Sequence, residues 1–321
     1  MLSRLLRFPR PRDLRALGIL GMNQRNAEFV LPGNPRANYP RVDDKVQTKL
    51  ICEKHGIPVP QTYAVIHWMG DIRKFGQLVG DRRDFVIKPS RGAEGRGIIV
   101  VVDRRDDIFI TAGGTELTTE DLRYHLENAL SGLYSLGGQP DKVIVEQRIV
   151  RHDVFDTIAV GGTPDVRIIL YRRIPVMAMV RLPTRASRGK ANLHQGAVAA
   201  AVDLATGITF GGVCENRAVT VHPDTKVAIA GVQLPQWHEL MIASMRLADG
   251  LEMEYVGVDF VLDANLGPVV LEANARPGLA IQIANRHGLL SRLRFIEAEK
   301  IGMPDIEARM RWCSDCRASR M

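Results

Sequence analysis

The chain has 321 residues, of which 45% are hydrophobic and 25% charged, and its formal net charge is +7. This composition is typical of a soluble globular protein, and no apolar run approaches the ~18 residues that a membrane-spanning helix needs. The arginines are dispersed and aromatic residues make up only 6%, so the charge favours phosphate-bearing small substrates over nucleic acid. No secretory signal is recognisable, and we expect a cytoplasmic protein with reduced thiols.

The N-terminus combines an Arg-rich arm with a polar stretch that contains Asn and Pro. A solvated helix is the favoured interpretation of the arm, and contact with a membrane surface, a partner or a second copy of the chain stays open. The lone "CSDC" near the C-terminus has no second cysteine pair, so we expect no zinc site there. We divide the chain into an arm with a short leading segment (1–40), two α+β domains (41–150 and 151–290) and a C-terminal helix with a polar tail (291–321).

After the arm, "DDKVQTKLICEKHG" has helical periodicity, with Asp43 or Asp44 as N-cap and Gly56 as the end. Strand-like runs follow at "QTYAVI", "DFVIKP", "GIIVVV" and "KVIVEQRIV", with helical runs at "DIRKFGQLV" and "TEDLRYHLENALSGLYSL". Strands and turns fill 165–213, and a helix near 236–249 precedes a last strand pair. This order predicts an α+β fold with antiparallel sheets and segregated helices.

The stretch "FVIKPSRGAEGRGIIVV" places Ser90, Gly92, Gly95 and Gly97 in a loop between two strands. A glycine-rich loop can turn its backbone N–H groups toward phosphate oxygens. No helix follows the glycines, which excludes a dinucleotide-binding fingerprint, and the "GK[ST]" of a P-loop is absent. Lys88 lies on the strand before the loop, where it either pairs with a phosphate or reaches solvent.

The last strand pair, "GVDFVLDANLGPVVLEANARPG", indicates a hairpin that turns at "ANLG". That turn sets Asp263 opposite Pro268 and Asp259 opposite Glu272, with Asn274 on the same face as Glu272. Directly opposed carboxylates repel each other unless a hard cation lies between them. The pattern therefore predicts a Mg²⁺ site, and a solvated acidic face is the alternative.

Lys88, the glycine-rich loop, "VIVEQRIV" and the acidic hairpin, in this order, resemble the ATP-grasp superfamily and more narrowly the RimK-type α-L-glutamate ligases. The resemblance covers roughly residues 41–290. It implies two α+β domains, with antiparallel sheets, that clamp ATP between them. About 40 residues precede the first lysine, where the family usually has a full domain of parallel strands, so we expect a reduced pre-ATP-grasp segment.

The implied activity is an ATP-dependent carboxylate–amine ligase that works through an acyl phosphate and releases ADP and phosphate. Glutamate is the expected amino-acid substrate, and the amine acceptor is a small molecule, a peptide or a protein tail. A phosphotransferase that acts on a hydroxyl and a non-catalytic ATP-binding subunit remain alternatives.

The resemblance also implies roles for single residues. Glu272 would bridge two Mg²⁺ ions in a site that also accepts Mn²⁺, and His194 is the candidate acceptor of the amine proton. The implied metal ligands are Asp259, Glu272 and Asn274, and the implied clamps for anionic groups are Arg167, Arg181 and Arg276. The residues expected to bind ATP are Lys45, Lys88, Ser90, Gly92, Gly95 and Gly97 for the phosphates, Glu146, Gln147, Arg148 and Ile149 for adenine, Asp153 for ribose, and Asn192.

Overall fold

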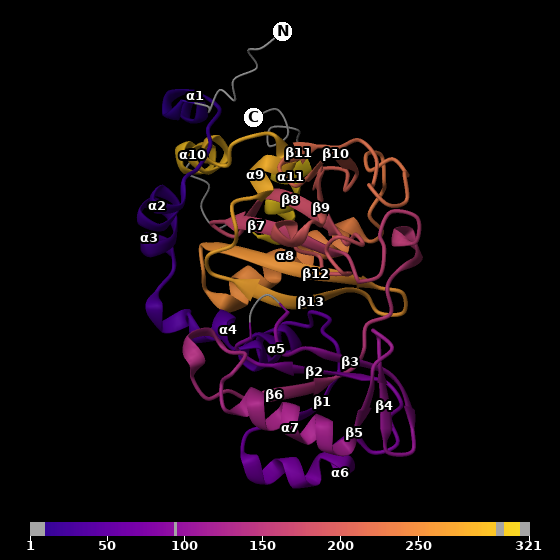
Figure 1. Cartoon of the computed structure of the whole chain (residues 1–321). Coiled ribbons are helices and arrows are strands. Elements are labelled where there is room, and N and C mark those ends of the chain that lie inside the picture. Colours follow the sequence, from indigo (N-terminus) through magenta and orange to yellow (C-terminus); the bar gives the residue numbers. More distant parts are fainter. Residues whose placement is uncertain (1–9, 93–94, 300–304, 315–321) are drawn as a thin grey trace.

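The computed structural model describes residues 10–92, 95–299 and 305–314 (Figure 1). Two sheets, both entirely antiparallel, organise the chain, as the sequence predicts. The strand order is β1-β6-β2-β3-β4-β5 in the six-stranded sheet and β11-β10-β9-β8-β7-β12-β13 in the seven-stranded sheet. In the described part of the chain, no helix is long and apolar enough to cross a membrane.

The six-stranded sheet carries its own apolar core, in which Phe75, Phe85 and Phe109 pack with ring centroids 5.9–6.5 Å apart. Helix α7 packs against β2 and β6 of this sheet. Its N-cap is Thr118, whose hydroxyl accepts a hydrogen bond from Asp121 N in a capping box. The elements of this domain are β1 (Thr62–Ile66), η3 (Met69–Lys74), α6 (Phe75–Val79), β2 (Phe85–Pro89), β3 (Ile99–Arg105), β4 (Ile108–Thr111), β5 (Glu116–Thr118), α7 (Thr119–Leu130), η4 (Leu136–Gly138) and β6 (Val143–Glu146).

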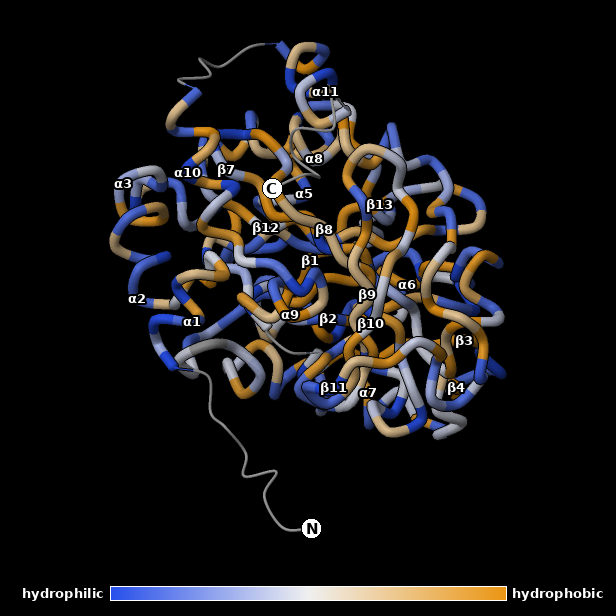
Figure 2. The backbone as a smooth tube through the Cα atoms, turned by 90° about the horizontal axis from the view of Figure 1, so that it is seen from above, coloured by the Kyte–Doolittle hydropathy of each residue, from blue (hydrophilic) through white to orange (hydrophobic). Residues whose placement is uncertain are grey.

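The seven-stranded sheet lies in the larger core, where helix α8 packs on β7, β8 and β12, and α9 packs on β8, β9 and β10. Every residue of β12 is buried, which explains its almost continuous apolar sequence. In Figure 2, which colours the chain by residue hydropathy, hydrophobic segments lie around β8 and β12. The elements are η5 (Asp153–Phe155), β7 (Asp165–Tyr171), β8 (Ile174–Leu182), η6 (Leu193–Gln195), β9 (Val198–Val202), β10 (Thr209–Cys214), β11 (Arg217–Ala218), α8 (Trp237–Leu251), β12 (Tyr255–Asp263), β13 (Gly267–Asn274), α9 (Ile281–Asn285), α10 (Leu290–Ala298) and α11 (Ile306–Ser314).

The N-terminal segment forms short helices, where the sequence shows only a polar stretch without periodicity. The segment runs along the larger domain (Figure 1), and the side chain of Asn34 pairs with both backbone groups of Tyr255, at 2.7 and 3.0 Å. Phe29 and Val30 are buried in that domain's core. These helices are α1 (Pro11–Ala16), α2 (Met22–Gln24), the π-helix η1 (Arg25–Val30), α3 (Leu31–Gly33), η2 (Arg36–Asn38) and α4 (Pro40–Asp43).

Helix α5 (Lys45–Lys54) connects the two domains. Its N-cap is Asp44, one of the two predicted residues, whose carboxylate accepts a hydrogen bond from Val46 N at 2.9 Å. The helix packs on α8 and β13 of the larger domain, and Cys52 belongs to that core. At its start, however, Lys45 N donates to Ser90 O of the smaller domain at 3.1 Å. The first turn of α5 therefore lies where the two sheets meet.

Candidate active site

The acidic hairpin pairs as the sequence predicts at the positions that matter for the site. Asp259 lies opposite Glu272, and Gly257 lies opposite Asn274. Near the turn the prediction is wrong by one residue, because Asp263 faces Gly267 rather than Pro268. An irregularity between Asp259 and Phe260 adds one residue on β13 and restores the predicted register.

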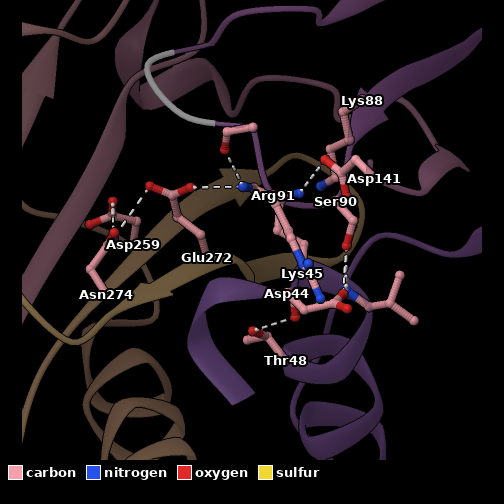
Figure 3. A network of polar contacts seen from close by, with 12 residues as sticks. Asp44, Lys45, Thr48, Lys88, Ser90, Arg91, Asp141, Asp259, Glu272 and Asn274 are labelled. Carbon is pink, nitrogen blue, oxygen red and sulfur yellow. Dashed lines mark hydrogen bonds and ion pairs between the residues drawn. The ribbon is translucent and has the colours of Figure 1, made fainter. Parts of the chain in front are cut away.

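The three predicted metal ligands converge in one cluster (Figure 3). Asn274 Nδ2 is 3.4 Å from Asp259 Oδ2 and 3.3 Å from Glu272 Oε1. Two carboxylates and an amide oxygen, which a flip of the Asn274 side chain would present, are the hard donors that Mg²⁺ prefers. The described residues hold no group of three or more His, Cys, Asp or Glu arranged for a metal, and in this cluster the third donor is an Asn.

Two arginines, Arg167 on β7 and Arg181 on β8, neutralise Asp259, an arrangement that the sequence reasoning missed. Arg167 lies directly across from Asp259 and donates to both its oxygens, at 2.6 and 2.5 Å, and Arg181 Nη2 donates to Oδ2 at 3.2 Å. Arg181 also lies across from Asp165 and pairs with it, with Nη2 2.7 Å from Oδ2. Arg167 and Arg181, two of the three predicted clamps for anionic groups, are thus held by protein carboxylates in this structure.

Burial and charge act in opposite directions on these carboxyl groups. Burial works to raise the pKa of Asp259, but the charges of Arg167 and Arg181 outweigh it and lower that pKa to about 2. Burial raises the pKa of Asp165 to about 6 despite the charge of Arg181, and the charge of Asp259 raises it further. The four side chains form a buried network in which Asp259 is the carboxylate held charged.

Lys45 connects the hairpin to the glycine-rich loop. Its ammonium group donates to Gly92 O at 2.7 Å and lies 3.6 Å from Glu272 Oε2 (Figure 3). The position follows from the capped start of α5, where Asp44 also accepts hydrogen bonds from Ser90 Oγ at 2.5 Å and Lys142 Nζ at 2.6 Å. Helix, loop and hairpin therefore meet at one cation.

Lys88 is buried on β2 and has a protein partner. Its Nζ is 2.5 Å from Glu146 Oε1, and Lys49 Nζ is 2.5 Å from Oε2 of the same carboxylate. Burial works to raise the pKa of Glu146, and the charges of the two lysines outweigh it and lower that pKa. Sequence reasoning placed Glu146 at the adenine and missed Lys49, although Lys49 follows Lys45 by four residues and so shares its helix face.

The glycine-rich loop is anchored at both ends. At the first end, Asp141 accepts hydrogen bonds from Arg91 N at 2.8 Å and from Ser135 Oγ at 2.5 Å. At the other, Gly97 has φ +70° and touches Tyr134 so closely that a Cβ would lie 2.5 Å from the ring. Gly95 has φ +72° and faces open space, and residues 93–94 of the predicted lid lie outside the described chain.

The segment after β6 joins the two domains. Gln147 N donates to Gln61 O at 2.8 Å on one side, and Val150 N donates to Asp263 Oδ2 at 2.7 Å on the other. The predicted nucleotide contacts of this segment stay predictions. Arg148 pairs with Asp84 at 2.9 Å, and Ile149 is half-buried. Asp153 is the first residue of η5, and its side chain is 84% exposed.

The remaining predicted residues are Arg276, Asn192 and His194. Arg276 is exposed and its guanidinium lies 5.4 Å from the centre of the Tyr39 ring. Asn192 caps η6, its side chain accepting a hydrogen bond from His194 N at 3.0 Å. The exposed His194 borders a cavity together with Gly278. Their proposed roles in the reaction stay predictions.

The family model of the sugar-transfer associated ATP-grasp proteins matches residues 24–298, well over half of the chain. A biotin carboxylase–β,γ-ATP complex from Campylobacter jejuni has a TM-score of 0.52 and 15% identity over 92% of this chain and 53% of its own. At this identity the likeness shows the fold alone.

Two further structures are more distant. D-alanine–D-alanine ligase from Bacillus anthracis, complexed with ATP, has a TM-score of 0.43 and 15% identity over 88% of this chain and 69% of its own. ATP-grasp ligase PsnB with its minimal precursor has a TM-score of 0.45 and 16% identity over 84% of this chain, which spans 63% of PsnB. No curated protein matches by sequence. The narrower RimK-type assignment is not shown, and what the family model establishes is that the chain belongs to the sugar-transfer associated ATP-grasp family.

Proposed function

We propose that this chain is an ATP-dependent ligase that joins a carboxylate to an amine. The observation that carries the proposal is the position of Lys45, between Gly92 O at 2.7 Å and Glu272 at 3.6 Å. This one cation lies where a glycine-rich loop, a helix start and an oxygen-donor cluster converge. Membership of an ATP-grasp family supports ATP as the nucleotide.

Asp259, Glu272 and Asn274 are the residues that would hold Mg²⁺. The ion, when bound, would neutralise negative charge on the triphosphate and so ease phosphoryl transfer. Lys45 and Lys88 would add charge-assisted hydrogen bonds to phosphate oxygens. Because both lysines already pair with carboxylates, their ammonium groups are oriented before the nucleotide arrives.

The proposed reaction has two steps. A substrate carboxylate oxygen attacks the terminal phosphorus of ATP, and the bond to ADP breaks, which leaves an acyl phosphate. The amine nitrogen then attacks the carbonyl carbon, phosphate leaves, and the nitrogen loses a proton to a base, for which His194 is the candidate. Arg167 and Arg181 keep Asp259 charged and fixed throughout.

A hydroxyl phosphotransferase is the second candidate. The matching family is described as associated with sugar transfer, and sugars offer hydroxyl groups in place of an amine. The ATP-binding half of the site would serve both reactions equally. The two differ in product, since only the ligase makes an amide and frees inorganic phosphate.

The test is to incubate the chain with Mg-ATP and panels of acids, with and without amines or sugars, and to measure ADP, phosphate and product mass. Mg-ATP at millimolar concentration should also raise thermal stability. Lys88→Ala should weaken ATP binding by about 1.5–3 kcal/mol, whereas the exposed Lys54→Ala serves as a control. A folded wild-type sample that shows no thermal shift and forms no ADP would contradict the proposal.

A further inference from the structure

A cavity of about 640 Å³ lies between the N-terminal segment and the stretch from Gly278 to Arg286, which follows β13 and includes α9. This volume is in the range of small-molecule sites. Its walls are mainly aliphatic and include Leu17, Leu20, Leu279 and Ile283. Leu17 is 61% exposed and Ile283 is 45% exposed, so the chain leaves apolar surface open here.

The polar groups of the cavity divide into one that is used by the fold and two that are free. The side chain of Gln282 accepts hydrogen bonds from Leu20 N at 2.8 Å and Leu289 N at 2.9 Å, and so fixes the N-terminal segment to α9. Within residues 10–92, 95–299 and 305–314, the side chains of Arg286 and His194 have neither a hydrogen bond nor an ion pair. The cavity thus has an apolar wall and an unpaired cation.

The cavity lies beside the proposed reaction site. Gly278, which lines it, follows Asn274 by four residues, and a Cβ on Gly278 would lie 3.8 Å from Arg167 Nη1. Arg167 is the residue that holds Asp259. Arg286, which also lines the cavity, directly follows α9. A ligand that fills the cavity therefore contacts Gly278, which lies beside Arg167, as well as a free guanidinium.

We propose that the cavity binds the acid substrate, and that this substrate is a linear aliphatic dicarboxylate rather than glutamate. Its reacting carboxyl group would lie toward Gly278, its methylene chain against the aliphatic wall, and its second carboxylate on Arg286. Glutamate fits less well because its charged amino group would enter an aliphatic wall. The assignment of the reacting end rests on the proposed ligase function, whereas binding in the cavity does not.

Isothermal titration of the full chain with C5 to C10 dicarboxylates and with glutamate, in the absence of ATP, tests the binding. Affinity should rise about fourfold for each added methylene until the cavity is full. Ile283→Glu should abolish the length dependence, and Leu266→Glu, at a similarly exposed leucine of the hairpin turn, should keep it. Arg286→Gln should weaken dicarboxylates about tenfold and leave monocarboxylates of equal length unchanged, and Arg286→Lys should restore most of the loss.

Binding that ignores chain length, or that survives Ile283→Glu, would overturn the inference. A full chain that binds no acid, but does bind acids once Leu5 and Leu6 are replaced by Ser, would also overturn the inference. In that case the N-terminus of the chain itself would occupy the cavity. Length-dependent binding without any ADP formation would leave the cavity assignment intact and refute the ligase. ADP formation with glutamate, together with dicarboxylate binding that does not depend on chain length, would support the ligase and refute the cavity assignment.

Discussion

Replacing Glu146 by Gln should destabilise the protein strongly, because this carboxylate is the shared partner of two buried lysines. The side chains of Lys49, Lys88 and Glu146 are only 8%, 7% and 3% exposed, and both ammonium groups lie 2.5 Å from the carboxylate. An amide keeps the shape but removes the charge, so two cations remain close together in a dry site. Breaking a buried ion pair in this way costs about 3–5 kcal/mol.

The pKa shifts of Glu146 and Lys49 determine how the loss of stability changes with pH. The pKa of Glu146 is lowered, so its contribution is complete above about 4.5 and is lost as pH falls toward the folded-state pKa. The difference between wild type and Glu146→Gln should therefore be largest near neutral pH and shrink in acid. Burial lowers the pKa of Lys49, so the variant should regain stability as pH rises toward that of a free lysine.

Urea unfolding followed by circular dichroism, at several pH values, measures these free energies. Glu116→Gln, at an exposed position on β5 of the same sheet, is the matched control and should change stability by less than about 0.5 kcal/mol. A loss below about 1 kcal/mol for Glu146→Gln at pH 7, or no change of that loss in acid, would refute the buried-pair reasoning.

Two further predictions concern the loop and the carboxylate network. Gly95→Val should lower the free energy of unfolding by only about 1–2 kcal/mol, because φ is +72° but the space beside Gly95 is open. The same change should slow turnover by more than tenfold, since the loop has to close over the phosphates. Equal losses of stability and turnover would indicate a purely structural loop. The pKa of Asp165 is raised to about 6, so the stability that its protonated form contributes is lost as pH rises from about 4 to 6. In Asp165→Asn, the free energy of unfolding should therefore depend less on pH over this window. Identical pH slopes for both chains would contradict this.

Local patterns predict the parts of the site that lie on one element or one hairpin. Alternation along β12 and β13 brings Asp259, Glu272 and Asn274 together, because side chains two residues apart share a face and the bulge leaves that face unchanged. Asp44 as an N-cap is predicted because a helix start needs an acceptor for its free N–H groups. Such short-range rules need no knowledge of the rest of the fold.

The missed contacts are those between residues far apart in the chain. Glu146 and Lys49 are 97 residues apart, and Arg167 and Asp259 are 92 apart. Neither pair can be inferred without the order of the strands, since periodicity fixes a side chain's face but not its neighbouring strand. The short helices from Met22 to Asp43 were missed for a related reason, because their stability comes from packing on the larger domain rather than from helical periodicity.

The central claim, that the acidic hairpin is a magnesium site for ATP chemistry, is tested most directly by Glu272→Gln. The side chain is 35% exposed and its pairing with Lys45 is 3.6 Å long, so its loss should change stability by no more than about 1 kcal/mol.

The measurement is the Mg-dependent thermal shift with ATP, taken together with ADP formation, on one preparation of each chain. Glu272→Gln should fold like the wild type, lose the Mg-dependent shift and form ADP orders of magnitude more slowly, whereas the exposed Glu239→Gln should behave as wild type. A folded Glu272→Gln chain that keeps the wild-type shift and the wild-type rate would contradict the central claim.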